Sequence, residues 1–253
     1  MPLNPATATR LEKSALDNGF DRGLGEVDGW MAFASTHAPV QVWLSAEPDG
    51  RPLVALSRQD VAQGLAELGA AVPIDVPSGA TDVLNVENIP TLGRLLRRAF
   101  QLARSLPTAL LKEFQQETAT LPRATEAERL VVQRVGQDIF RAGLMEYWEG
   151  RCAITGLAVP ELLRASHIKP WADCETDAER LDVFNGLLLA PHLDAVFDLG
   201  FITVTDDGAV LVSRALHDDA RRTLGLGDVL RVHRLGTKHR HYLSWHQEKL
   251  FKG

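Results

Sequence analysis

The sequence predicts an α+β protein with two domains, on the grounds of its length, its composition and the order of its elements. The chain has 253 residues, whereas one domain takes roughly 100–200 residues. Hydrophobic residues make up 45% and charged residues 24%, which is ordinary for a globular chain and excludes a disordered or collagen-like one. Pro122 marks a hinge, so we expect a small α/β domain over residues 1–122 with a helical connector, and a second domain over residues 123–253.

The N-terminal half carries both helical and strand-like patterns. We expect a short amphipathic helix over residues 5–18 and another that starts at Ser57 or Asp60 and runs to about Leu68. Runs of β-branched, aromatic and aliphatic residues predict three strands, at Trp30–Ser35, Val40–Ser45 and Pro52–Ser57. The proline- and glycine-containing stretch 71–91 is typical of a loop.

Three helices are predicted after this loop. Apolar residues at helical spacing begin at Leu92, and Pro107 ends that helix and allows a second one to about Glu117. A long helix with an apolar stripe then runs from about Glu126 to Glu149.

The net charge of −6 conceals two basic stretches. Residues 221–253 hold eight basic and two acidic side chains, a net charge of +6, and four of the eight histidines. Arg94, Arg97 and Arg98 stand at spacings that place them on one helix face. Two basic patches in an acidic chain indicate a nucleic-acid partner, with an ordinary solvated helix face as the alternative.

Residues 151–216 carry the pattern that indicates chemistry. A strand with a tight turn is expected at 151–156, and a short strand then presents His167 before Pro170 stops it. After an acidic loop, the sequence predicts a turn and apolar strand at 185–190, a helix at 191–198, and a hairpin of strands at 201–204 and 209–212.

This pattern resembles the HNH endonuclease family, and more narrowly a bacterial restriction-type branch of it. The matching residues are Cys152-Ala-Ile-Thr-Gly156, Ser166-His-Ile-Lys-Pro-Trp171, Asn185-Gly-Leu-Leu-Leu189, Phe197-Asp198 and the late Tyr242-Leu-Ser-Trp-His246. They span roughly residues 140–253 and leave the N-terminal half uncovered. The resemblance implies a ββα-metal fold and a metal-dependent DNA endonuclease that leaves 5′-phosphate and 3′-hydroxyl ends.

The resemblance also assigns His167 as the general base. A neutral imidazole can take a proton from water because its pKa lies near working pH. The alternative is a strand histidine that is hydrogen-bonded to a neighbour. Asn185 matches the family's asparagine, which holds the loop through backbone hydrogen bonds and so orients the base. As an alternative, Asn185 is simply a turn residue before Gly186.

Metal ligands are expected on the helix after Asn185. In the family they fall nine and sometimes thirteen residues after this asparagine, which points to Asp194 and Asp198 here. Residues four apart share a helix face, and carboxylates suit one Mg²⁺ or Mn²⁺. His192 is a weaker candidate, because it is turned about 200° from Asp194. Ser166 is also weaker, since a neutral hydroxyl stands where the family often has Asp or His.

Asp194 has an alternative role as an acid that the helix dipole favours near the helix start. We expect no structural zinc, because Thr155 stands where a second cysteine would follow Cys152. Cys152 and Cys174 are instead expected to be buried thiols.

The expected partner is double-stranded DNA, either unmodified or modified. The candidate DNA contacts are Arg164 and Lys169 beside the base, Arg240 in the basic C-terminal stretch, and Arg94, Arg97 and Arg98. The N-terminal domain would then recognise DNA or mediate oligomerisation. A symmetric double-strand cut requires two active sites, hence a homodimer.

Two other functions stay open, and both would use the same ββα domain. The substitution by Ser166 suggests a catalytically weak or inactive DNA-binding module, and a nuclease toxin is the other alternative. We expect no membrane span, because no run of about 18 apolar residues occurs. The N-terminus lacks the pattern of a secretory signal, so we expect a cytoplasmic protein.

Overall fold

The protein forms two compact units, Met1–Arg104 and Ser105–Gly253. The computed structural model describes residues 3–227 and 229–253. Met1, Pro2 and Asp228 lie outside the described residues. The first two belong to the N-terminal stretch used for the prediction on a secretory signal, and Asp228 was counted in the charge of residues 221–253. Both units mix helix and sheet, which confirms the α+β class.

The division falls before helix α4 (Pro107–Thr118), whereas we placed the domain boundary after it, at residue 122. Helix α4 packs against α5 (Glu126–Tyr147) and therefore belongs to the second unit. The Pro122 segment is the connection between these two helices, and a capping box of Thr125 and Glu128 starts α5.

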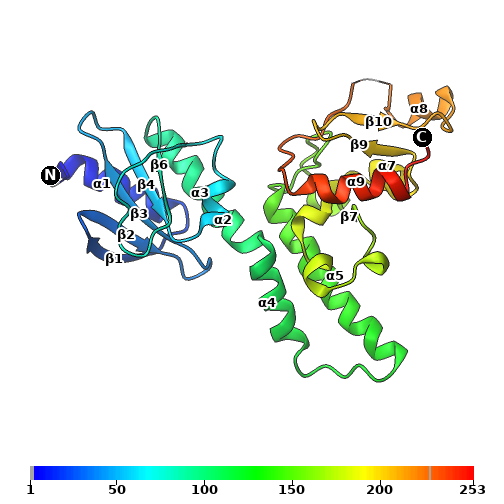
Figure 1. The fold of residues 1–253 in the computed structure, drawn as a ribbon, viewed down its shortest axis with the longest axis horizontal. Helices are drawn as coiled ribbons and strands as arrows, with labels where there is room; N and C mark the ends of the chain where they lie inside the picture. Colours follow the sequence, from blue (N-terminus) through cyan, green and yellow to red (C-terminus); the bar gives the residue numbers. More distant parts are fainter. Residues whose placement is uncertain (1–2, 228) are drawn as a thin grey trace. The chain divides into compact units, whose positions relative to one another are not determined.

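The first unit is built on an antiparallel sheet (Figure 1). Its strands lie in the order β1-β2-β3-β4-β6-β5. Their bounds are β1 Arg22–Val27, β2 Trp30–Ala34, β3 Gln41–Ala46, β4 Pro52–Leu56, β5 Ala70–Ala71 and β6 Asp82–Asn85. The helices are α1 Pro5–Asp17, α2 Gln59–Gln63 and α3 Ile89–Ser105. The three predicted strands are confirmed as β2, β3 and β4.

Two segments of this sheet contradict the prediction. Strand β1 was missed because it is exposed along most of its length and contains two glycines, so it shows no apolar alternation. The stretch 71–91 is not only a loop, because β6 lies within it and pairs with β4. Its Val83 and Leu84 are both buried, but the prolines and the glycine around them conceal the strand in the sequence.

The amphipathic sequence of helix α3 corresponds to one buried side and one exposed side. Leu92, Leu95 and Leu96 are fully buried on one side of the helix. Arg94 and Arg97 lie exposed on the other side, and Arg98 is half-buried. The arginine face that was predicted as a candidate DNA contact is therefore present at the surface.

The second unit places a small hairpin against two helices. Strand β7 (Arg164–His167) pairs antiparallel with β8 (Gly186–Leu189), and α7 (Pro191–Asp198) follows β8 directly. Both α5 and α7 pack on this hairpin. The remaining elements are η1 Pro160–Leu162, η2 Trp171–Asp173, α6 Asp177–Arg180, η3 Val183–Asn185, β9 Ile202–Val204, β10 Val210–Val212, α8 Asp218–Thr223 and α9 His239–Lys249.

Two further expectations for this unit need correction. Residues 152–156 form a turn rather than a strand, with the Gly156 N–H bonded to the Cys152 carbonyl, and Glu149 and Gly150 before it adopt positive φ. Helix α9 was not predicted, because its buried side amounts to little more than Tyr242, Leu243 and two histidines.

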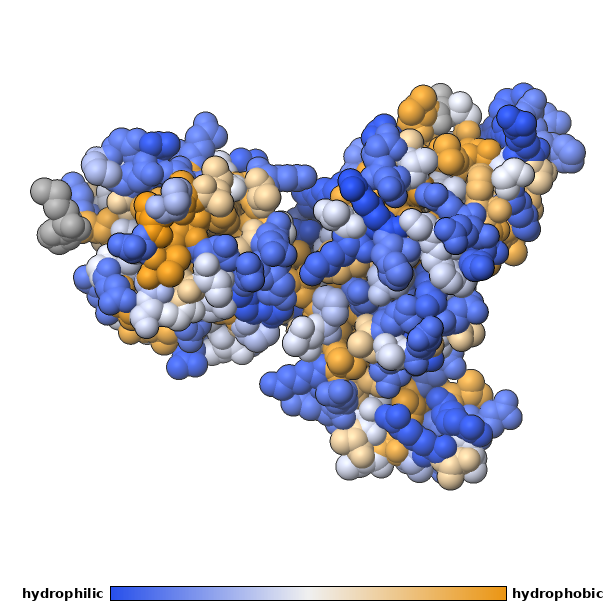
Figure 2. Space-filling view, viewed as in Figure 1, coloured by the Kyte–Doolittle hydropathy of each residue, from blue (hydrophilic) through white to orange (hydrophobic). Residues whose placement is uncertain are grey.

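None of the helices in the described part of the chain has the length and apolar composition that crossing a bilayer requires. On the face shown in Figure 2, hydrophilic residues predominate and hydrophobic residues form smaller patches between them.

Candidate active site

The two faces of β7 carry different chemistry. Successive side chains of a strand point to opposite faces, so Arg164 and Ser166 share one face and Ala165 and His167 share the other. The Ser166 hydroxyl lies 3.1 Å from Asp198 Oδ1 on α7. The His167 ring instead stacks on Phe140 of α5.

A pair of carboxylates faces Ser166. Burial raises the pKa of Asp194, while Ser166 and the nearby Arg164 charge act in the opposite direction. Burial also raises the pKa of Asp198, and the charge of Asp194 raises it further. Both carboxylates lie within reach of the Ser166 hydroxyl, and Asp194 lies close enough to Asp198 to raise its pKa, in line with their spacing on one helix face.

The ring of His167 is wedged between two aromatic side chains. Its centroid lies 3.8 Å from that of Phe140 at an interplanar angle of 16°, and Trp171 meets it edge-on. Its Nε2 lies 2.9 Å from the Arg180 carbonyl oxygen, and since a carbonyl can only accept, Nε2 carries the proton. Burial lowers the pKa of His167 to about 4, so the ring is neutral at pH 7 and Nδ1 keeps its lone pair.

Asn185 is fully buried and ties the loop after β7 to the start of β8. Its Oδ1 accepts from the Lys169 N–H at 2.7 Å, and its Nδ2 donates to the Lys169 carbonyl at 3.1 Å. The same Nδ2 lies 3.3 Å from Cys174 Sγ and 3.3 Å from the Glu179 carbonyl. The side chain therefore makes the backbone bonds to the loop that the family resemblance implied.

The structure separates residues that the sequence analysis expected together. It gathers Ser166, Asp194 and Asp198 but places His167 on the other face of the strand, because neighbours on a strand alternate. His192 lies exposed on α7. Arg164 is exposed on the face of the carboxylates, which suits a phosphate contact.

Lys169 is already paired. Its ammonium lies 2.7 Å from Glu179 Oε1, and this contact raises the pKa of Lys169. Burial alone would raise the pKa of Glu179, but the bonds from Lys169 and from the Glu175 N–H outweigh it and lower that pKa. Arg240 lies exposed on α9.

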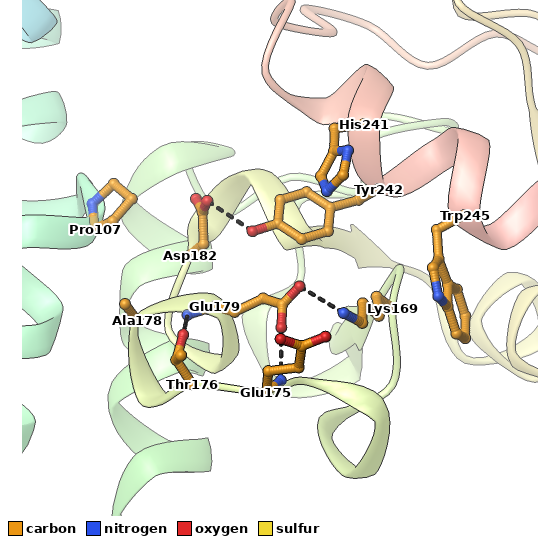
Figure 3. A pocket seen from close by; sticks show the side chains of 10 residues that line it. All are labelled: Pro107, Lys169, Glu175, Thr176, Ala178, Glu179, Asp182, His241, Tyr242 and Trp245. Atoms are coloured by element: carbon orange, nitrogen blue, oxygen red, sulfur yellow. Dashed lines mark hydrogen bonds and ion pairs between the residues drawn. The ribbon is translucent and has the colours of Figure 1, made fainter.

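A groove of about 610 Å³ lies over this ion pair (Figure 3). It is lined by Pro107, Lys169, Glu175, Thr176, Ala178, Glu179, Asp182, His241, Tyr242 and Trp245. Three carboxylates face one paired lysine there, so the groove is unfavourable for a phosphate.

The two cysteines are buried thiols, as expected. Cys152 Sγ accepts from the Thr155 N–H and from the Ala190 N–H just before α7, both at 3.4 Å. Burial raises the pKa of Cys174 to about 11.

The partners of the site that sequence reasoning missed are Phe140, Arg180, Tyr242 and His246. Only the last two had a signal, because they stand in the late motif that resembled the family. Arg180 contacts His167 through its backbone carbonyl. Every residue type has this group, so the sequence could not indicate the contact.

The carboxylate pair on α7 offers oxygen ligands of the kind that a divalent cation requires. Within residues 3–227 and 229–253, no group of three or more His, Cys, Asp or Glu side chains is placed to hold a metal ion. Mg²⁺ is nonetheless commonly held by one or two carboxylates, with water and substrate phosphate completing its shell. Asp194 and Asp198, with the Ser166 hydroxyl between strand and helix, fit that requirement.

A pair of antiparallel strands followed by a helix with two carboxylates, and a buried asparagine before the second strand, is the ββα arrangement that the resemblance implied. Residues 152–205 match the model of a family described as HNH endonuclease. This match confirms the resemblance to the HNH family for that part of the chain, and proteins of this family are DNA nucleases that generally use a divalent metal. A comparison with curated proteins finds no match.

Proposed function

We propose that the protein is a metal-dependent endonuclease that hydrolyses double-stranded DNA, in a restriction-type role against foreign or modified DNA. The observation that carries this proposal is the pairing of Asp194 with Asp198 against Ser166, beside the exposed Arg164. The charge of Asp194 raises the pKa of Asp198, and a cation between two neighbouring carboxylates would offset that repulsion. Arg164 would hold a phosphate of the backbone next to that cation.

In this proposal Asp194 and Asp198 hold one Mg²⁺ or Mn²⁺, and Ser166 contributes its hydroxyl directly or through water. When bound, the cation offsets the charge that develops on the phosphate oxygens. Asn185 holds the loop in place, and the exposed arginines Arg94, Arg97 and Arg240 contribute to binding the DNA backbone.

His167 is the proposed base, acting through Nδ1. The ring lies on the α5 side of β7, and rotation about its Cα–Cβ bond alone cannot carry it to the Ser166 side. This role therefore requires the backbone at the end of β7 to move when DNA and metal bind, against the bond from the Ile168 N–H to the Asn185 carbonyl. That movement would exchange the bond to the Arg180 carbonyl for contact with the attacking water.

The test is plasmid cleavage with Mg²⁺ or Mn²⁺ by the wild-type chain and by His167→Gln. Glutamine can still donate to the Arg180 carbonyl but cannot take a proton at neutral pH, so we expect intact DNA binding and loss of cleavage by at least about 100-fold. Near-normal cleavage by His167→Gln would leave this histidine as a packing residue.

A DNA-binding module without catalysis is the second candidate function. It is favoured by the neutral Ser166 and by the position of His167 away from the carboxylates. Binding of DNA without nicking, over the full range of metal concentrations, would establish it. Digestion of differently modified substrates, with mapping of the ends, tests the restriction role and the expected 5′-phosphate products.

A further inference from the structure

Helix α9 contacts the C-terminal end of α7, which carries Asp198. His246 of α9 is fully buried, and its Nε2 lies 3.1 Å from the carbonyl oxygen of Phe197, the residue just before Asp198. The imidazole also stacks on the Phe197 ring, with centroids 4.0 Å apart at 9°. A single side chain of α9 thus contacts both the backbone and the side chain of the last turn of α7.

The hydrogen bonds of His246 determine its tautomer. The Phe197 carbonyl can only accept, so Nε2 carries the proton and Nδ1 accepts from the Thr203 hydroxyl at 2.9 Å. Burial lowers the pKa of His246, which keeps the ring neutral. Both ring nitrogens are therefore satisfied, and the donor is directed at the Phe197 carbonyl in the last turn of α7, which also accepts from the Gly200 N–H at 2.9 Å.

The same helix also holds the turn before Asn185. The Tyr242 hydroxyl donates to Asp182 Oδ2 at 3.0 Å, as Figure 3 shows. Asp182 in turn accepts from the Phe184 N–H through Oδ1 and from the Asn185 N–H through its carbonyl. Helix α9 is thereby bonded to both ends of the segment 182–198, at Asp182 and at Phe197.

Packing alone does not explain an imidazole at position 246. A phenylalanine would stack on Phe197 equally well and would not require burial of two polar nitrogens, which is costly unless both are bonded. The nitrogens of His246 are used for bonds to α7 and to β9. This use indicates a role in fixing where α7 ends.

We propose that His246 is a positioning residue for the cation site: by donating Nε2–H to the Phe197 carbonyl, it fixes the last turn of α7 and so holds the Asp198 carboxylate beside Asp194. This inference rests on the proposed function, because it concerns the cation that this function requires. His246 touches neither carboxylate and acts only through the backbone of α7. Residues that orient metal ligands in this way typically affect metal affinity about 10–100-fold.

The test measures Mn²⁺ binding to the full chain without DNA. The electron paramagnetic resonance signal of free Mn²⁺ reports how much of the ion remains unbound. His246→Phe keeps the stacking but loses the donor, and we expect its Mn²⁺ dissociation constant to rise at least about tenfold. Glutamine reaches the Phe197 carbonyl with its amide N–H₂, whereas asparagine is too short. We therefore expect His246→Gln to bind nearly as wild type and His246→Asn to bind as weakly as His246→Phe.

His239→Phe is the matched control. His239 is a fully buried histidine of the same helix, but it packs among Tyr147, Trp148 and Phe184 and bonds to Gly236 rather than to α7. We expect its Mn²⁺ affinity to equal that of the wild type. Circular dichroism of each variant establishes that it is folded, and if His246→Phe does not fold, the comparison of His246→Gln with His246→Asn decides.

Three results would overturn the positioning role: wild-type affinity in folded His246→Phe, equal weakness of His246→Gln and His246→Asn, or an equal loss in His239→Phe. Plasmid nicking by the wild type separates this inference from the proposed function. If the wild type binds Mn²⁺ and nicks DNA while all His246 variants match it, only the positioning role fails. If the wild type neither binds Mn²⁺ nor nicks DNA, the proposed function fails and the inference fails with it.

Discussion

Replacing Asn185 by alanine should loosen the loop after β7 and destabilise the second unit. The side chain is fully buried, and its two shortest bonds go to the N–H and the carbonyl of Lys169, at 2.7 and 3.1 Å. Each buried backbone group left without a partner costs about 1–3 kcal/mol, so the two together cost about 2–4 kcal/mol after partial relaxation. For a unit of this size, that lowers the melting temperature by roughly 5–15 °C.

Scanning calorimetry measures the melting temperature, and hydrogen exchange measures the protection of the Lys169 amide directly. Asn185→Ala should remove that protection, because Oδ1 is the acceptor of this N–H. Asn85→Ala is the control, since Asn85 bonds to Glu47 in the first unit and should leave the Lys169 amide unchanged. An unaltered exchange rate at Lys169 in Asn185→Ala, with a melting shift below about 2 °C, would refute the reasoning.

Three further predictions concern other parts of the chain. Gly200→Ala should prevent close packing of the C-terminal segment, because the added Cβ would lie 2.0 Å from the Leu250 carbonyl oxygen and φ is +70°; a melting temperature equal to that of the wild type would contradict this. Burial lowers the pKa of His239 to about 4, so the unfolded state binds protons first as pH falls below about 6.5, and acidification destabilises the fold. The stability difference between wild type and His239→Phe should therefore shift by about 2 kcal/mol against the wild type between pH 7 and pH 5, measured by urea unfolding, whereas a constant difference would rule out the buried neutral ring as the cause. Arg97→Ala with Arg98→Ala should weaken DNA binding and flatten its dependence on salt, and an unchanged salt slope would make this face of α3 a purely solvated one.

The hairpin and helix of the candidate site were predictable from local signals. The Asn185-Gly186 turn, the apolar run after it and Pro191 at the start of a helix each determine structure within a few residues. The two carboxylates on α7 follow from the same logic, since residues four apart on a helix share a face.

The side of β7 on which His167 lies was not predicted, although the alternation of side chains along a strand would have indicated it. Ser166 and His167 are neighbours on one strand, so only one of them can face α7 while the other faces α5. The family resemblance placed both near the cation, and the alternation of the strand places Ser166 there. Its bond to the Arg180 carbonyl depends on the tertiary fold and has no counterpart in the residue pattern.

The missed elements have a common physical cause. Strand β1 and helix α9 carry little of the periodic apolar pattern by which elements are recognised in a sequence. Strand β1 is mostly exposed, and α9 is held by the polar groups of Tyr242 and His246 as well as by apolar packing. Such partners are determined by segments distant in the chain, which local patterns do not encode.

The buried thiol of Cys174 can report how often the loop around Asn185 opens. The Cys174 sulfur lies 3.3 Å from the Asn185 amide nitrogen, and the residue is only 3% exposed. Burial raises the pKa of the thiol to about 11. The thiolate is the form that attacks an alkylating reagent, so this buried, protonated sulfur is expected to react when the loop detaches and exposes it. The rate of labelling at Cys174 therefore counts how often the loop opens.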